Sequence, residues 1–131
     1  MDISKAQICL QTIEDSITNL GYSERKMGET ILGICMCTAL IGKLTYNRFQ
    51  LLNEMLDLDI DYFSLRFVAE KYGNDKGKYS REKLQDYLRP FCSLPKVLFE
   101  IQRLMFVIVS ADGTIPDDVR DEVLAVTASS T

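Results

Sequence analysis

The chain has 131 residues, of which 47% are hydrophobic and 26% are charged. This length fits one globular domain over residues 1–131, with a core that needs no disulfide or metal to hold it together. The net charge of −4 disfavours broad binding to nucleic acid or to an anionic membrane, because both need a positive field. The longest apolar runs are too short to span a bilayer and the N-terminus lacks signal-peptide features, so we expect a cytoplasmic protein.

Histidine and tryptophan are absent from the sequence. Histidine is the commonest general base and metal ligand, so its absence weighs against most enzyme classes. No cysteine has a histidine partner, and no serine occupies a strand–turn–helix elbow, so we predict that the chain is not an enzyme and holds no cofactor. The cysteines are too few for a secreted disulfide scaffold and are typical of buried thiols in a reducing compartment. They are Cys9, Cys35, Cys37 and Cys92.

Apolar residues recur at helical spacing through the first half of the chain. Ser23 and Thr45 are suited to cap the second and third helices, and Gly42 ends the second, whose apolar far end predicts the central buried helix. Asp59 or Asp61 is expected to cap a fourth helix. The inner face of the first helix consists of Ala6, Leu10, Ile13, Ile17 and Leu20, with Gly21 just beyond its end. The third helix presents Phe49, Leu52, Met55 and Leu56, and the fourth carries Phe63, Phe67 and Val68 and ends at Gly73.

The second half begins with the most loop-like segment, residues 73–78. Ser80 can cap a short fifth helix that Pro90 limits, and Pro95 and Pro116 suit the starts of a sixth and a seventh. We expect residues 127–131 to fray. No segment alternates with period two for long enough to form a strand, so the sequence predicts an all-α domain of about seven helices. The inner residues expected in the last two helices are Val97, Leu98, Ile101, Leu104, Met105 and Ile108, then Val119, Val123 and Val126.

A shift of 71 residues aligns residues 39–45 with residues 110–116. In each copy an apolar helix reaches a glycine turn, followed by an aliphatic residue two positions on and a residue suited to start a helix. Gly42 falls on Gly113, and Leu52 falls on Val123. The pattern predicts two related helix–turn–helix units; the alternative is two ordinary helical hairpins that both use glycine.

The second turn, Ser-Ala-Asp-Gly-Thr-Ile at residues 110–115, resembles the ADG-x-I turn of the tellurite-resistance TerB-like proteins. That family is all-helical, about this long, and has two such turns related by pseudo-symmetry. The resemblance covers residues 31–56 and 101–128 and implies the same architecture.

Family members usually carry a glutamate six residues after the turn glycine, in an acidic set that is associated with metal binding. This sequence has Arg48 and Val119 at those positions, and Ile41 stands where Asp112 stands in the second turn. The resemblance therefore leaves Asp112 as a candidate ligand, and we predict no complete metal site. Asp117 and Asp118 would be its neighbours; helix capping and solvation are the alternative role for all three.

Two other patterns were compared with known motifs. Asp57, Asp59 and Asp61 match the opening of a calcium loop, but Tyr62 and Val68 stand where the loop needs glycine and a bidentate acid. Residues 73–80 have the wrong spacing for a phosphate loop.

One stretch is basic with tyrosines interleaved, and it is interpreted as a solvated face, a protein-contact rim or a single-stranded RNA site. Its cations are Lys71, Lys76, Lys78, Arg81 and Lys83, and nearby acids dilute their field, so no direct nucleic-acid binding is expected.

A small acidic helical domain without catalytic residues is typical of a protein that binds another protein's surface. We predict an inhibitor or immunity-type protein that neutralises a basic partner such as a nuclease toxin. The alternatives are a TerB-like stress-response or metal-responsive protein and a structural subunit of a helical assembly. The predicted partner-binding residues form two acidic groups, Glu54, Asp57, Asp59 and Asp61 and, on a separate turn, Asp112, Asp117, Asp118 and Asp121.

Overall fold

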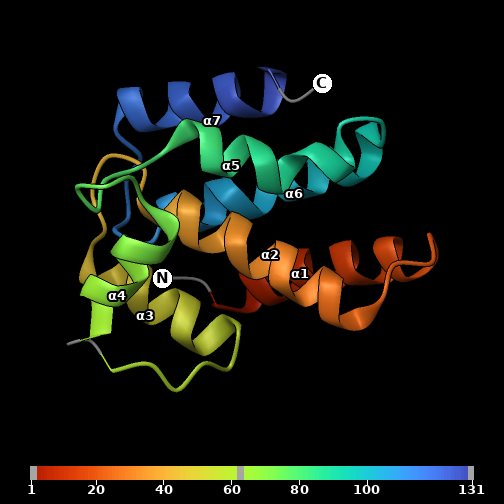
Figure 1. Cartoon of the computed structure of the whole chain (residues 1–131), viewed down its shortest axis with the longest axis horizontal. Coiled ribbons are helices and arrows are strands. Elements are labelled where there is room, and N and C mark those ends of the chain that lie inside the picture. The colour runs from red at the N-terminus through yellow and green to blue at the C-terminus, as the bar shows by residue number, and fades with distance from the viewer. Residues whose placement is uncertain (1–2, 62–63, 130–131) are drawn as a thin grey trace.

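Helices account for the regular secondary structure of the described chain. The computed structural model describes residues 3–61 and 64–129, which contain seven α-helices and no strand (Figure 1). The prediction of an all-α domain of about seven helices is therefore confirmed. Within the same ranges, no helix has the length and apolar composition needed to cross a membrane. The helices are α1 (Ile3–Thr18), α2 (Glu24–Ala39), α3 (Tyr46–Met55), α4 (Leu65–Tyr72), α5 (Arg81–Leu88), α6 (Pro95–Val109) and α7 (Asp117–Ser129).

Side-chain caps begin three of these helices where the sequence predicts them. The hydroxyls of Ser23, Thr45 and Ser80 each accept a hydrogen bond from the backbone N–H three residues later, at 3.2 Å. Each cap satisfies one of the N–H groups that a helix leaves without an internal partner. Pro95 occupies the first position of α6, as predicted, where its missing N–H costs nothing.

The core lies around α2 and α6. Eight residues of each helix are buried. α6 packs against α1, α2, α3 and α7, and α2 also packs against α3, α4 and α5. In Figure 1, α2 crosses the middle of the molecule, with α7 along one side and the segment after α3 along the opposite side. The prediction that the second helix is central is correct, and α6 shares that position with it.

The 71-residue shift relates two helix–turn–helix units of the fold. α3 begins at Tyr46 and α7 begins at Asp117, which are 71 residues apart. Gly42 and Gly113 both have positive φ angles, +74° and +101°, which residues with a Cβ rarely adopt. Buried residues recur at the same shift, as in the pairs Leu52 and Val123, Met55 and Val126, and Ile34 and Met105.

The start of the fourth helix differs from the prediction. α4 begins at Leu65, so neither Asp59 nor Asp61 caps it, and Ser64 at the cap position makes no side-chain cap bond. The reason lies upstream, where Asn53 bonds to Ile60 and keeps this segment out of a helix. The predicted inner residue Phe63 lies outside the described residues.

Three further residues differ from their predicted places. Leu20 is 47% exposed because α1 ends at Thr18, and the helical period no longer applies beyond it. Phe67 is 71% exposed because the short α4 turns Val68 and Tyr72 inward instead. Thr127 is buried inside α7 and is not frayed. Its hydroxyl donates to the Val123 carbonyl and accepts from the Gln102 side chain, both at 2.8 Å.

The glycine turns generate a stability prediction. A Cβ added to Gly42 would lie 3.0 Å from a methyl group of Val119, so the second unit packs directly on the first turn. We expect Gly42→Ala to cost about 1–2 kcal/mol through its positive φ, and more through the Val119 contact. Val119→Ala removes the contact alone. Urea unfolding of both single variants and the double variant should give a coupling energy of about 1 kcal/mol; additive costs would contradict the contact.

Candidate functional site

A buried arginine lies between the two glycine turns. The Arg48 side chain is 4% exposed, and its Nη1 donates hydrogen bonds to the carbonyls of Ala39, Ile41 and Lys43 at 3.1, 2.6 and 2.8 Å. These carbonyls belong to the end of α2 and to the turn after it, where no further helical N–H reaches them. Arg48 therefore caps α2 with a positive charge, which the negative end of the helix dipole favours.

The second turn supplies the counter-charge for this arginine. Arg48 Nε lies 3.9 Å from Asp112 Oδ2 and has no hydrogen-bond partner among the described atoms. The same carboxylate accepts hydrogen bonds from the Thr45 hydroxyl at 2.8 Å and the Asn47 amide at 3.0 Å. Burial lowers the pKa of Arg48, and the neighbouring Asp112 partly offsets that shift. The candidate metal ligand Asp112 thus has three partners within the protein.

The acids near the second turn do not converge on one point. Asp117 and Asp121 each lie 3.3 Å from Arg120, on the exposed side of α7. Among the described residues, no three Cys, Asp or Glu side chains come together in a way that could hold a metal ion. Val119, which corresponds to Arg48 in the repeat, is buried against Gly42.

The eight predicted partner-binding acids do not form one surface. α7 and the segment after α3 lie along opposite sides of the molecule (Figure 1). In the second group, Asp112 accepts a hydrogen bond from Thr45, and Asp117 and Asp121 form ion pairs with Arg120. The group on the other side is more open, and we call it the acidic edge. It consists of Glu54, Asp57, Asp59 and Asp61.

Exposed and partly buried residues alternate along the backbone of the acidic edge. Residues 57, 59 and 61 are exposed, whereas Leu58 and Ile60 are partly buried against the core. The Asn53 side chain fixes this segment because its amide donates to the Ile60 carbonyl at 3.3 Å and its oxygen accepts from the Ile60 N–H at 3.2 Å. Asp57 has φ +51°, a left-handed conformation that aspartate tolerates better than most residues.

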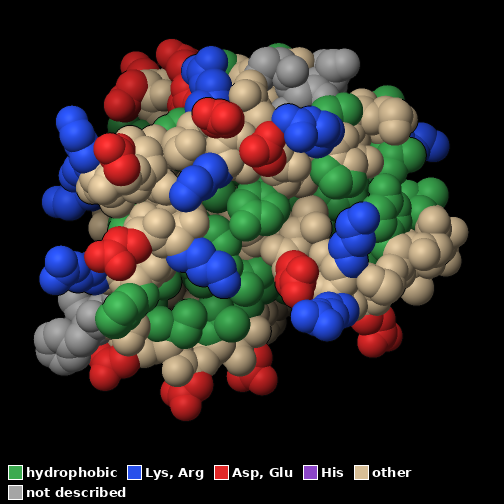
Figure 2. Space-filling view, in the orientation of Figure 1, with side chains coloured by type: hydrophobic (Ala, Val, Ile, Leu, Met, Phe, Trp, Pro, Cys, Tyr) green, Lys and Arg blue, Asp and Glu red, His purple; other side chains and the backbone are tan. Residues whose placement is uncertain are grey.

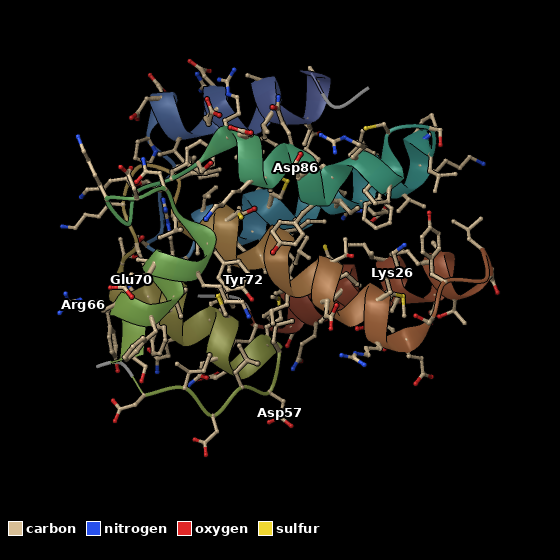
Figure 3. All side chains as sticks on the ribbon, in the orientation of Figure 1. Lys26, Asp57, Arg66, Glu70, Tyr72 and Asp86 are labelled. Atoms are coloured by element: carbon tan, nitrogen blue, oxygen red, sulfur yellow. The ribbon has the colours of Figure 1, made fainter. Side chains whose placement is uncertain are left out.

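The carboxylates of the acidic edge point into solvent. Figure 2 shows acidic side chains along this border of the molecule, below a band of hydrophobic ones, and Figure 3 shows Asp57 pointing away from the helices. In the part of the chain that is described, Glu54, Asp57 and Asp59 form no ion pair. Their charges are therefore available to another molecule.

An apolar hollow of about 250 Å³ opens beside the acidic edge. Among its lining residues, Ile31 is the most buried, at 5% exposed, and Gly28 of α2 is exposed. A Cβ on Gly28 would meet no atom within 4 Å, so packing does not require glycine there. Glycine inside a helix costs about 1 kcal/mol relative to alanine. The lining consists of Glu14, Met27, Gly28, Ile31, Leu32, Leu56 and Leu58.

The basic stretch is partly used inside the protein. Lys83 donates to the carbonyls of Lys71 and Gly73 at the end of α4, at 3.2 and 2.6 Å. Arg81 and Tyr79 both bond to Glu122, which ties the start of α5 to α7. Lys83, Arg81 and Tyr79 are thus engaged within the fold, a role that none of the three interpretations from the sequence included.

The cysteines are free thiols, and three of the four are buried. Burial raises the pKa of both Cys35 and Cys37 to about 12. The reactive thiolate is therefore scarce near neutral pH. This agrees with their interpretation as small buried hydrophobic residues.

Comparison of the sequence with protein-family models and with curated proteins, and of the fold with solved structures, gives no match.

Sequence reasoning missed Arg48 and the apolar hollow. Arg48 lies four and seven residues before Leu52 and Met55, on the inner face of α3. A cation at such an inner position is a signal that it has buried partners. The hollow left no comparable signal, because its walls come from three separate segments.

Removal of the buried guanidinium provides a test of this centre. We expect Arg48→Met to destabilise the fold by about 3 kcal/mol, since it removes three hydrogen bonds from a charged donor and leaves the Ile41 carbonyl with only the Lys43 N–H. Asp112→Asn should cost less, because the amide keeps an acceptor for Thr45. The matched control is Arg103→Met, which breaks an exposed pair with Glu100 and should change stability by less than about 0.5 kcal/mol. Equal urea midpoints for Arg48→Met and the wild type would contradict this role.

A pH dependence follows from Glu122. Hydrogen bonds from Arg81 and Tyr79 lower the pKa of Glu122 below 4.5, against an opposing effect of burial. A carboxylate with a lowered folded-state pKa stabilises the fold above its unfolded pKa, and the contribution is lost as the pH falls through the folded pKa. Glu122→Gln should therefore lower the thermal midpoint at pH 7, and the difference should shrink towards pH 3. Glu82→Gln, at an exposed position of the same region, should leave the profile unchanged.

Proposed function

We propose that this chain is a non-enzymatic protein-binding module that docks a basic protein through its acidic edge. The observation that carries the proposal is a row of exposed carboxylates on a segment that Asn53 fixes. Among the residues that the structure describes, Glu54, Asp57 and Asp59 of this row form no ion pair. The form that fits this chemistry is an inhibitor or immunity-type protein that covers the cationic cleft of a nuclease toxin.

Electrostatics supports this choice of partner. Exposed like charges on one border repel one another, and a cationic surface relieves that repulsion. Opposite charge also steers the two proteins together and speeds their association. The net charge of −4 adds to the same attraction.

The chemistry of the side chains supports a binding role over a catalytic one. The sequence has no histidine to act as a general base. The buried thiols of Cys35 and Cys37 are held protonated. A TerB-like stress-response or metal-responsive protein is the alternative from the sequence, but no observation specifically favours it, because Asp112 is engaged by Thr45, Asn47 and Arg48.

Paired isolation of two variants tests the proposal. Wild-type chain, the double variant Asp57→Asn with Asp59→Asn, and the control Asp117→Asn with Asp118→Asn are purified gently from the native host and examined by native mass spectrometry. We expect a basic protein at fixed stoichiometry with the wild type and the control. The variant Asp57→Asn with Asp59→Asn should retain at most about a tenth as much of this basic protein as the wild type does. The reason is that it associates with the partner more slowly, with a rate that depends less on salt.

Both amide substitutions preserve shape, and asparagine is well suited to the positive φ of Asp57. A wild-type chain isolated without a protein partner would contradict the proposal. So would equal retention of the partner by the two double variants.

A further inference from the structure

We propose that the apolar hollow receives one large apolar side chain from a Lys- and Arg-rich segment of the partner, while Asp57 and Asp59 contact the cations beside it. This inference rests on the proposed function and names the kind of segment that the acidic edge binds. The two features are adjoining, because Leu56 and Leu58 line the hollow and flank Asp57 in the chain.

The size of the hollow indicates a single side chain as its occupant. Its volume of about 250 Å³ is below the roughly 300–1,000 Å³ of sites that enclose drug-sized molecules. Apart from Glu14 and Gly28, its lining consists of aliphatic or thioether side chains, from Met27 and Leu32 of α2 to Leu56 and Leu58 after α3. A buried apolar anchor surrounded by a polar rim is a usual arrangement in protein–protein interfaces.

The charges around the hollow favour particular residues next to the apolar side chain in the partner segment. Glu14 belongs to its lining on the α1 side, and Asp57 and Asp59 flank Leu58 on the other. No Lys or Arg occurs among its described lining residues. A segment with cations on both sides of an apolar residue is complementary to this arrangement, whereas an acidic segment is repelled.

Gly28 lies in the lining of the hollow. It is helical and exposed, and its position neither needs a positive φ nor approaches another atom closely. Glycine therefore weakens α2 at a position where neither the backbone conformation nor the packing requires it. Because Gly28 lines the hollow and has open space around it, we expect a larger side chain at this position to occupy the hollow without displacing core residues.

Three peptides and the intact labelled protein test the inference. The acetylated and amidated peptides are Lys-Lys-Leu-Lys-Lys, the same peptide with Ser in place of Leu, and Glu-Glu-Leu-Glu-Glu. Each is titrated into the ¹⁵N-labelled chain while amide shifts are followed by NMR. We expect the basic Leu peptide to bind about tenfold more tightly than the Ser peptide, with the largest shifts at Gly28, Leu56 and Leu58, and the acidic peptide not to bind.

Two variants separate the apolar contribution from the ionic one. Gly28→Leu fills the hollow and should reduce the Leu-to-Ser preference to about one, whereas the control Gly28→Ala adds only a methyl group and should retain it. Asp57→Asn with Asp59→Asn should weaken both basic peptides by about fivefold and leave their ratio unchanged.

The outcomes distinguish this inference from the proposed function. Equal binding of the two basic peptides, weakened by the Asp57 and Asp59 substitutions, would overturn the anchor and leave the acidic edge as a docking surface. Binding of the acidic peptide, largest shifts at another surface, or a Leu preference that survives Gly28→Leu would each overturn it too. If no peptide shifts any amide, the inference is wrong, and the proposed function is decided by the isolation of the partner.

Discussion

Arg48 places a positive charge where the backbone carbonyls at the end of α2 converge, and Asp112 brings a negative charge to it from the other half of the chain. The guanidinium and the carbonyls would each be unfavourable here without the other groups. A guanidinium at this depth needs a counter-charge, and the carbonyls need a donor. Because Thr45 both caps α3 and donates to Asp112, one side chain fixes a helix start and the contact between the turns. The relative placement of the two helix–turn–helix units follows from this small group of bonds.

The parts of the fold that sequence reasoning predicted depend on short-range chemistry. A hydroxyl before a helix can accept the N–H three residues on, and a glycine after a helix can adopt a positive φ, through contacts with near neighbours in the chain. The sequence near each position was therefore enough to predict the helix caps Ser23 and Thr45 and the turns at Gly42 and Gly113. The 71-residue repeat was legible for the same reason, because it is a repeat of these local signals.

The parts that were missed depend on contacts between distant residues. The aspartates after α3 look like helix caps until Asn53 is seen to hold the segment in another conformation. Acidic residues do occupy the first turn of α7, so composition alone does not separate the two cases. The apolar hollow needs α1, α2 and the segment after α3 to be placed together first. Half of the candidate site, its carboxylates, was thus readable from the sequence, and its cavity was not.

The bond between Thr45 and Asp112 joins residues that are 67 positions apart. The first helix–turn–helix unit precedes Asp112 in the chain, so Arg48 has no counter-charge from Asp112 until the second unit docks. Such a contact closes a large loop, whose entropic cost is met only when the second unit docks. The chain should therefore fold as one cooperative unit, and neither half is expected to form a stable intermediate on its own.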